Sequence, residues 1–331
     1  MTPFGGPPAR DGRGIHGPSR AAAARPEVWV ADDPRDSVPT AAEVCNVLYG
    51  GFHNSTESRR LAGELAAAWP PLRHHTYAGR ALVRRMVQHL IAAGVEQFLD
   101  IGGGIAQHGA THEIIADTIT DPSARPLPGL TPAGGPAQRA RVVCADLDPI
   151  ATDVNRRHLE DLAWATAVVG DLRRPHSILD DPVVNTTLNL DRPVGVLLLG
   201  VLHHLPPDAD LVQILRTTAD ALTPGSYLAV SLLTIDPDPA GAAAQRHAAA
   251  LYTRTPTPLH LRPARNITDL LQHPQLPDLH LVDPGVVPAH HWQPDPDDEP
   301  GFPAPHLLAA LARIGPAAPS DTAGSRPGPP C

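Results

Sequence analysis

The sequence predicts an α/β fold, in which a doubly wound, mostly parallel sheet of seven strands follows an N-terminal helical extension. Two patterns carry this prediction. From Glu96 onward, short and almost continuously apolar segments bounded by Gly, Asp or Pro alternate with segments of helical periodicity. Such alternation is typical of parallel strands that helices cover on both faces of the sheet. Before Glu96, apolar residues recur at helical spacing, which places helices in front of the sheet.

The N-terminal part divides into a tail and a helical segment. Residues 1–39 are rich in proline, and we expect a disordered tail there. Within residues 40–94, Leu61, Leu65 and Trp69 recur at helical spacing. A longer apolar stripe with arginines on its opposite side predicts a second helix, and its members are Leu82, Val83, Met86, Val87, Leu90 and Ile91.

Residues 95–294 contain the strands of the predicted sheet domain. Five apolar runs predict strands at 97–101, 141–146, 166–171, 193–200 and 226–234. A sixth strand is expected within residues 279–289, with a bulge at Pro284–Gly285. Residues 121–140 show no periodicity, and we interpret them as a surface insertion between the first helix and the second strand.

Capping residues mark where several helices begin. Asp148 followed by Pro149 predicts an N-cap with proline at the first helical position, and the helix should run to about Leu162. An apolar stripe within 211–222 predicts another helix, which either Asp208 or Asp210 caps. Later helical patterns cover residues 240–254 and 264–272.

The C-terminal segment, residues 295–331, is again rich in proline. Residues 306–315 fit either a strand that closes the edge of the sheet or a helix, and the order of the other elements favours the strand.

Composition excludes several classes of function. The formal net charge is -9 and no basic block is present, which argues against a sequence-independent nucleic-acid binder. All 26 basic residues are arginines, so Schiff-base, pyridoxal and lysine-dependent P-loop chemistry are excluded. The longest apolar run, residues 194–202, is too short to span a bilayer. We expect a soluble, cytoplasmic protein without nucleic-acid or membrane partners.

A glycine turn follows the first predicted strand. Gly102, Gly103 and Gly104 permit a tight turn and let the backbone approach a ligand closely. A nicotinamide or flavin fingerprint would need a third glycine at position 107, where Gln107 stands. The order Asp-x-Gly-x-Gly that begins at Asp100 instead suits S-adenosylmethionine, whose ammonium group the carboxylate can meet.

Further acids follow the next two predicted strands. Asp146 is placed to accept hydrogen bonds from both ribose hydroxyls, and Leu147 follows it. Asp171 can accept a hydrogen bond from an adenine amino group, with Leu172 packing nearby. Because parallel strands end at one edge of the sheet, these acids are expected beside the glycine turn.

With these motifs the chain resembles the class I S-adenosylmethionine-dependent methyltransferases. More narrowly, it resembles an actinobacterial S-adenosyl methyltransferase family formerly known as a domain of unknown function. The resemblance covers roughly residues 42–294, and its motifs include NVLYGGFHN, QFLDIGGG, HEII, RVVCADLDP, GDLRRP, DRPVGVLLLGVLH and LTPGSYLAVS. It implies a seven-stranded Rossmann-like methyltransferase sheet and S-adenosyl-L-methionine as cofactor. Two departures are Ile105–Gly109, where the family has Leu-Pro-Thr-Gln-Gly, and Phe52–His53, where it has Lys-Asp.

The resemblance also completes the predicted cofactor site. Gly200, which ends the fourth predicted strand, is placed at the cofactor. Tyr49, Gly50 and Gly51 lie in the front motif, and we expect them to close over the cofactor as part of a helical lid formed by residues 40–94.

The implied reaction is methyl transfer to a small-molecule acceptor by in-line displacement, which requires alignment and exclusion of water. His203 and His204 follow the fourth strand, where either could accept a proton from the acceptor. Adjacent residues point in opposite directions, so only one can serve. Alternatively, one packs near the adenine and the other caps the next helix.

Two other functions remain open at this stage. One is a non-catalytic S-adenosylmethionine-binding or scaffold protein of the same fold, and the other is a nicotinamide-dependent dehydrogenase, which Gln107 disfavours. His108, His112 and Glu113 have the spacing of a metal site, but the sequence offers no third ligand from elsewhere, and we assign no metal.

Overall fold

A computed structural model of the chain describes residues 38–106, 109–120, 140–294 and 303–315. It contains one mixed sheet of eight strands, of which seven form the order β3-β2-β1-β4-β5-β8-β6, while β7 pairs with β8 beside this path. The strands are β1 (Gln97–Ile101), β2 (Arg141–Asp146), β3 (Ala165–Val169), β4 (Val194–Leu198), β5 (Tyr227–Leu233), β6 (Leu279–Leu281), β7 (Val287–Pro288) and β8 (Leu307–Ile314).

The first five strands pair in parallel, and β8 runs antiparallel to β5, β6 and β7. The helices are α1 (Ala41–Leu48), α2 (Thr56–Ala68), α3 (Leu72–Ala92), α4 (Thr111–Thr120), α5 (Pro149–Leu159), α6 (His176–Leu179), α7 (Pro182–Thr187), α8 (Leu211–Asp220), α9 (Pro239–Tyr252) and α10 (Arg265–Leu271), with short 3-10 turns η3 (Leu202–His204) and η4 (Ala289–His291).

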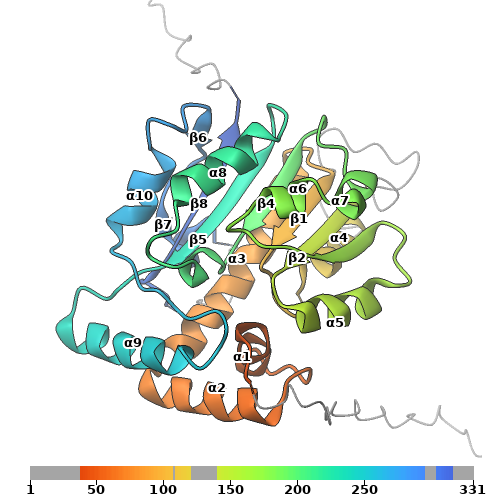
Figure 1. The fold of residues 1–331 in the computed structure, drawn as a ribbon. Coiled ribbons are helices and arrows are strands. Elements are labelled where there is room, and N and C mark those ends of the chain that lie inside the picture. The colour runs from red at the N-terminus through yellow and green to blue at the C-terminus, as the bar shows by residue number, and fades with distance from the viewer. Residues whose placement is uncertain (1–37, 107–108, 121–139, 295–302, 316–331) are drawn as a thin grey trace, which may run out of the picture.

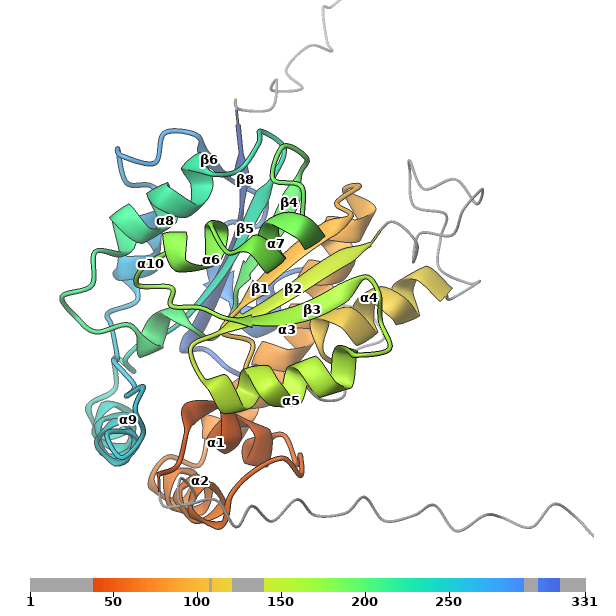
Figure 2. The same ribbon diagram turned by 45° about the vertical axis from the view of Figure 1, so that its right-hand side comes forward.

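Helices cover both faces of the sheet, as Figures 1 and 2 show. One apolar core joins α6, α7, α8 and α10 to one face through residues such as Ile178 and Leu215. A second core joins α3, α4 and α5 to the other face through residues such as Met86 and Ile115. Burial of near-continuous apolar strands between two helical layers stabilises the doubly wound arrangement. The predicted fold class is therefore confirmed.

Several predicted details differ from the structure. The expected sixth strand with a bulge is two short strands, β6 and β7, because the chain turns at the cis Asp283–Pro284 peptide bond and at Gly285, whose φ is 77°. The sheet consequently has eight strands rather than seven. The segment 306–315 does form a strand, β8, but it lies between β5 and β6 and not at the edge.

Two helices, α6 and α7, have no counterpart in the sequence prediction, and α1 falls within the helical segment expected over residues 40–94 without being predicted separately. Asp148 caps α5 as predicted, by accepting a hydrogen bond from the Ile150 N–H. Of the two predicted caps for α8, Asp210 is the one that accepts a bond, from Gln213 N–H. Most of the predicted tail, residues 1–37, and most of the predicted insertion, residues 121–139, lie outside the described residues.

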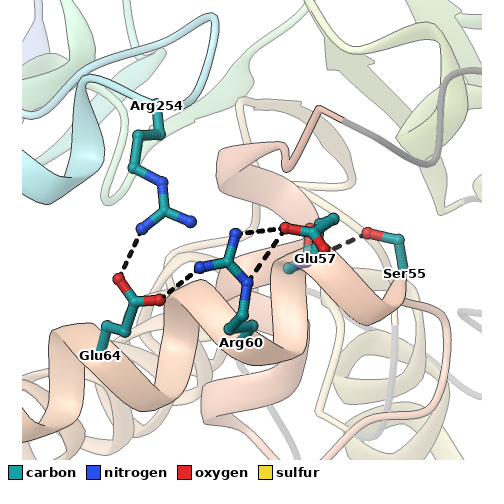
Figure 3. A network of polar contacts seen from close by, with 6 residues as sticks. Ser55, Glu57, Arg60, Glu64 and Arg254 are labelled. Carbon is teal, nitrogen blue, oxygen red and sulfur yellow. Dashed lines mark hydrogen bonds and ion pairs between the residues drawn. The ribbon is translucent and has the colours of Figure 1, made fainter.

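The front helices α1 and α2 pack as a unit around a buried carboxylate. Glu43 accepts hydrogen bonds from the Ser55 N–H, the Ser55 hydroxyl and the Ser58 hydroxyl. On the other side of α2, a network of ion pairs reaches α9 (Figure 3). Arg60 pairs with Glu57 and Glu64, and Arg254, just after α9, also pairs with Glu64. A third apolar core lies between α1, α2 and α9. Among the described residues, no helix has the length and apolarity that a bilayer crossing needs.

Candidate cofactor-binding site

The glycine turn at the carboxyl end of β1 is required by its surroundings. Gly102 has a φ of 76°, and a Cβ atom there would lie 2.7 Å from the Cβ of Val201. A Cβ atom on Gly103 would lie 2.9 Å from both carboxylate oxygens of Asp100. Glycine is the residue that tolerates such a φ and such close approach. The turn thus brings backbone against the Asp100 carboxylate.

Asp100 is held from the side of α4. The Thr111 hydroxyl donates a hydrogen bond to its Oδ2 at 2.6 Å. Burial raises the pKa of Asp100, while the Thr111 hydrogen bond and the charge of Arg80 lower it in part. A buried carboxylate of this kind gains free energy when a cation binds beside it.

Asp146 lies at the end of β2 and faces the same turn. Its Oδ2 accepts the Gly104 N–H at 3.0 Å, and its Oδ1 accepts the Asp148 N–H at 2.9 Å. Burial raises its pKa to about 6, and the nearby charges of Asp148 and Asp100 act in the same direction. Each carboxylate oxygen has about two lone-pair positions, so one position on each oxygen remains for a ligand.

These residues line one recess at the carboxyl edge of the sheet. Its lining comes from β1, β2, the glycine turn and helices α3, α4 and α5, and includes Arg80, Asp100, Gly103, Gly104, Asp146 and Asn155. The open space between them is about 20 Å³, which is room for about one water molecule. A ligand of nucleoside size needs a few hundred Å³. The acidic and polar lining suits the charged and hydroxyl groups of the cofactor, but the open space is smaller than such a ligand.

Helix α1 packs beside this recess. Ala42 packs against Ile105 and Ala151, and its Cα lies 3.7 Å from the position of a Cβ on Gly104. Tyr49, the C-cap of α1, has the Arg80 guanidinium over its ring at 4.5 Å from the centroid. The front motif that follows α1 is therefore joined to a residue that lines the recess.

The glycines of the front motif and Gly200 make other contacts. Gly50 has a φ of 82° and donates to the Val47 carbonyl, while Gly51 donates to the Asn46 carbonyl. Gly200 also has a φ of 82°, and no heavy atom lies within 4 Å of a Cβ built there. Its N–H donates to the Ser231 hydroxyl. The backbone at Gly200 is thus open on the side where a side chain would stand.

Asp171 stands in different surroundings from the other two acids. Its Oδ1 accepts from the N–H and Nε of Arg173, and its Oδ2 accepts from Arg173 Nη2 at 2.9 Å. Burial raises its pKa, but the hydrogen bonds and charges of Arg173 and Arg174 outweigh this, so the pKa is lowered. Leu172 packs in the apolar core, and Leu147 is 39% exposed. Asp171, Leu147 and Leu172 do not line the recess.

His203 and His204 lie in η3 at the carboxyl end of β4, on the edge of the sheet that carries the recess. Burial lowers the pKa of both imidazoles, and that of His203 falls furthest. In the part of the chain that the structure describes, no group of three His, Cys, Asp or Glu residues is arranged to hold a metal. His108 falls outside that part.

Among the residues of the recess that the sequence prediction missed, Arg80, Asn155 and Thr111 make polar contacts there. The helical pattern placed Arg80 on a solvent-facing side, but its Nη1 donates to the Gly109 carbonyl at 3.0 Å. Asn155 is buried and holds the turn, since it donates to the Gly104 carbonyl and accepts the Ala106 N–H. An asparagine on the buried face of a predicted helix is a signal that could have found it. Thr111 gave no such signal.

Comparisons with known proteins find similar sequences and folds. A family model described as S-adenosyl methyltransferase matches residues 29–127 and 132–315. A solved structure of a provisionally assigned methyltransferase from Thermobifida fusca is 31% identical, covers 84% of this chain and 96% of its own, and has a TM-score of 0.68. A DUF574 family protein from Streptomyces avermitilis is 28% identical, with 85% and 99% covered and a TM-score of 0.69. No curated protein matches the sequence.

Proposed function

Because the S-adenosyl methyltransferase family model matches residues 29–127 and 132–315, the chain belongs to that family, and we propose that it transfers a methyl group to a small-molecule acceptor by in-line displacement. S-adenosyl-L-methionine is the cofactor and supplies an electrophilic methyl group when bound. The observation that carries the proposal is the convergence of Asp100, Asp146 and the glycine turn on one recess.

The recess suits the charged groups of the cofactor. We assign the methionine ammonium to Asp100, whose partly buried carboxylate lacks an ion-pair partner among the described residues. Arg80 lines the same recess and would pair with the methionine carboxylate. Asp146 would accept both ribose hydroxyls at the lone-pair positions that the backbone N–H groups leave free.

The remaining predicted contacts are assigned to the adenine and to the methionine chain. Asp171 keeps one lone-pair position beside its bonds to Arg173, and this position would accept the adenine amino group. Leu147, which is partly exposed, would cover the ring, and Leu172 would support Asp171 from the core. The open backbone at Gly200 would face the methionine chain.

The protein's part in the transfer is to align the reactants and exclude water. We propose that residues 40–94 act as the lid, with Tyr49, Gly50 and Gly51 at its moving edge. The small recess and the packing of Ala42 of α1 beside Ile105 and Gly104 support this proposal. We place the acceptor beside His203 and His204 at the end of β4.

Limited proteolysis tests the lid. Cleavage within residues 40–90 should slow when S-adenosylhomocysteine is added, while cleavage near the exposed surface of α7 should not change. Identical digestion of residues 40–90 with and without the ligand would contradict the lid.

Calorimetry tests the function itself. Micromolar binding of both S-adenosylmethionine and S-adenosylhomocysteine is expected. The closed recess favours one alternative, a non-catalytic scaffold of the same fold, and this alternative predicts that neither compound binds. Mass spectrometry of the purified protein adds an independent check, because a tightly held cofactor would co-purify.

We further propose a cytoplasmic enzyme whose acceptor diffuses freely. The net charge of -9 and the absence of a basic block support an acceptor other than nucleic acid.

A further inference from the structure

His203 and His204 differ in the ring nitrogen that carries the proton. Nδ1 of His203 accepts a hydrogen bond from the Leu233 N–H at 3.3 Å. In a neutral imidazole, the nitrogen that accepts is unprotonated and the other carries the hydrogen. His203 therefore has its proton on Nε2 and its lone pair occupied by the backbone of β5, so it has no free position to accept a proton.

His204 has the opposite arrangement. Its Nδ1 lies 3.0 Å from the Thr257 carbonyl and 3.3 Å from the Pro258 carbonyl. Carbonyl oxygens only accept hydrogen bonds, so Nδ1 of His204 carries the proton and Nε2 carries the lone pair. No hydrogen bond to this Nε2 is found within the described part of the chain. A backbone contact that fixes one tautomer is how proteins orient an imidazole base.

A series of side chains connects His204 with the cofactor recess. The Tyr252 ring lies 5.6 Å from the His204 ring, centroid to centroid. The Tyr252 hydroxyl lies 3.9 Å from the Cys45 sulfur. Arg80 and Asp146, which both line the recess, act on the pKa of the Cys45 thiol: the charge of Arg80 lowers it and that of Asp146 raises it. The side chains come from η3, α9 and α1, which meet at this edge of the sheet.

These side chains are uncharged at neutral pH. Burial raises the pKa of the Tyr252 hydroxyl and of the Cys45 thiol, and burial lowers the pKa of His204. The Arg262 guanidinium lies beside η3, where it donates to the Leu202 and Leu205 carbonyls, and a guanidinium repels an ammonium group. Tyr252 is buried in an apolar core and packs against the His204 ring, so the surroundings of His204 are aromatic and apolar and favour a flat, apolar partner. The surroundings thus select an uncharged aromatic compound over an amine.

We propose that His204, and not His203, is the general base of the methyl transfer, and that the acceptor is an uncharged aromatic compound with a phenolic hydroxyl. This inference rests on the proposed function. The hydroxyl proton moves to Nε2 of His204 while the hydroxyl oxygen bonds to the methyl carbon. The carbon–sulfur bond breaks and its electron pair stays on sulfur, which gives an aryl methyl ether and S-adenosylhomocysteine. The imidazolium then releases its proton to solvent.

The tautomers are tested first, without any ligand. Ring nitrogen NMR of the 15N-labelled protein at pH 7.5, with His203→Gln and His204→Gln used to assign the signals, distinguishes protonated from unprotonated nitrogens. We expect Nε2 of His204 to be unprotonated and Nε2 of His203 to be protonated. The opposite assignment at His204, or a charged His204 ring, would overturn the proposal. This result does not depend on whether the protein binds the cofactor.

The acceptor class is tested next, with phenol as the probe and the S-adenosylhomocysteine complex as the protein. Phenol should produce a saturable shift of the His204 Nε2 signal, whereas anisole, which lacks the hydroxyl, and benzylamine, which is cationic, should not. His204→Gln should weaken phenol binding at least tenfold, and His203→Gln less than threefold. A shift with anisole equal to that with phenol, or none with either, would refute the acceptor class.

The two proposals can fail separately. If calorimetry shows no binding of S-adenosylhomocysteine, the proposed function fails whatever the tautomers are. If S-adenosylhomocysteine binds but phenol leaves the His204 signal unchanged, the methyltransferase proposal stands and the inference about base and acceptor fails.

Discussion

The acids at the ends of β2 and β3 are neighbours in the sheet but lie in opposite electrostatic surroundings. Asp146 is held by two backbone N–H groups, and no arginine or lysine pairs with it among the described residues. Asp171 forms ion pairs with the guanidinium groups of Arg173 and Arg174. Burial raises the pKa of Asp146 to about 6, whereas the arginines bring the pKa of Asp171 below its usual value.

This difference shows how a protein can position a carboxylate without neutralising it. Backbone N–H groups orient Asp146 but carry no net charge, so its negative charge and half of its lone-pair positions stay available. A guanidinium orients Asp171 and also compensates its charge. A buried acid without a compensating cation is energetically unfavourable in the free protein, and such groups cluster at functional sites. We therefore expect cofactor affinity to depend far more on Asp146 than on Asp171.

The largest expected effect comes from removing each acid in turn. Asp146→Ala should weaken S-adenosylhomocysteine binding about 100-fold, because two hydrogen bonds to a charged group are lost at about 1.5 kcal/mol or more each. Asp171→Ala should weaken it less than about tenfold, because one lone-pair position is left for the ligand. Calorimetry gives both affinities, and Asp153→Ala on the exposed face of α5 serves as the control.

Equal losses of affinity for S-adenosylhomocysteine in Asp146→Ala and Asp171→Ala would contradict the expected difference between the two acids. Since Asp146 also bonds to Gly104 and Asp148, thermal unfolding of each variant should confirm that the fold persists. Asp146→Asn provides a second variant of the same shape without the charge.

The next effect is a dependence of affinity on pH. The ligand hydroxyls need the ionised form of Asp146, whose pKa is about 6 in the folded protein. Above pH 6 the affinity for S-adenosylhomocysteine should be nearly constant, and below it the affinity should fall by up to about tenfold per pH unit, because a bound proton has to leave first. Asp146→Asn should show a flatter profile between pH 5 and pH 7. A wild-type profile as flat as that of the variant would contradict the raised pKa.

The sequence predicted the fold better than it predicted the electrostatics of the site. Strand–helix alternation and the glycine turn depend on local pattern, so β1 and β2 begin and end where the apolar runs do. The contrast between Asp146 and Asp171 was not predictable in this way. Both acids follow apolar strands, and the arginine that compensates Asp171 stands only two positions further along the chain. Whether the Arg173 side chain reaches back to the Asp171 carboxylate depends on the conformation of the turn after β3.

The cover of the recess depends on contacts between distant segments. Arg80 was expected on the solvent side of its helix, because helical periodicity describes one helix and not what packs against it. In the structure α1 and the loop before α4 lie against that side, so Arg80 contacts Tyr49 and the Gly109 carbonyl. Short helices such as α1 also provide too few residues for a reliable pattern.

The smallest expected effect is on the free energy of unfolding, when the arginine that pairs with Asp171 is removed. Arg173→Met removes the ion pair with Asp171. Because the Arg173 side chain is 49% exposed, solvent screening limits the loss in the free energy of unfolding to about 1 kcal/mol. The folded pKa of Asp171 is lowered, so this contribution is present above the unfolded pKa and is lost as pH falls through the folded pKa. Urea unfolding should therefore separate wild type from variant at pH 7, and the difference should shrink as pH falls below the unfolded pKa of about 3.9. The affinity of the same variant for S-adenosylhomocysteine is a second measurement. A gain in affinity would show that Arg173 competes with the adenine for Asp171. Without Arg173, the acid at the end of β3 would then behave like Asp146 at the end of β2.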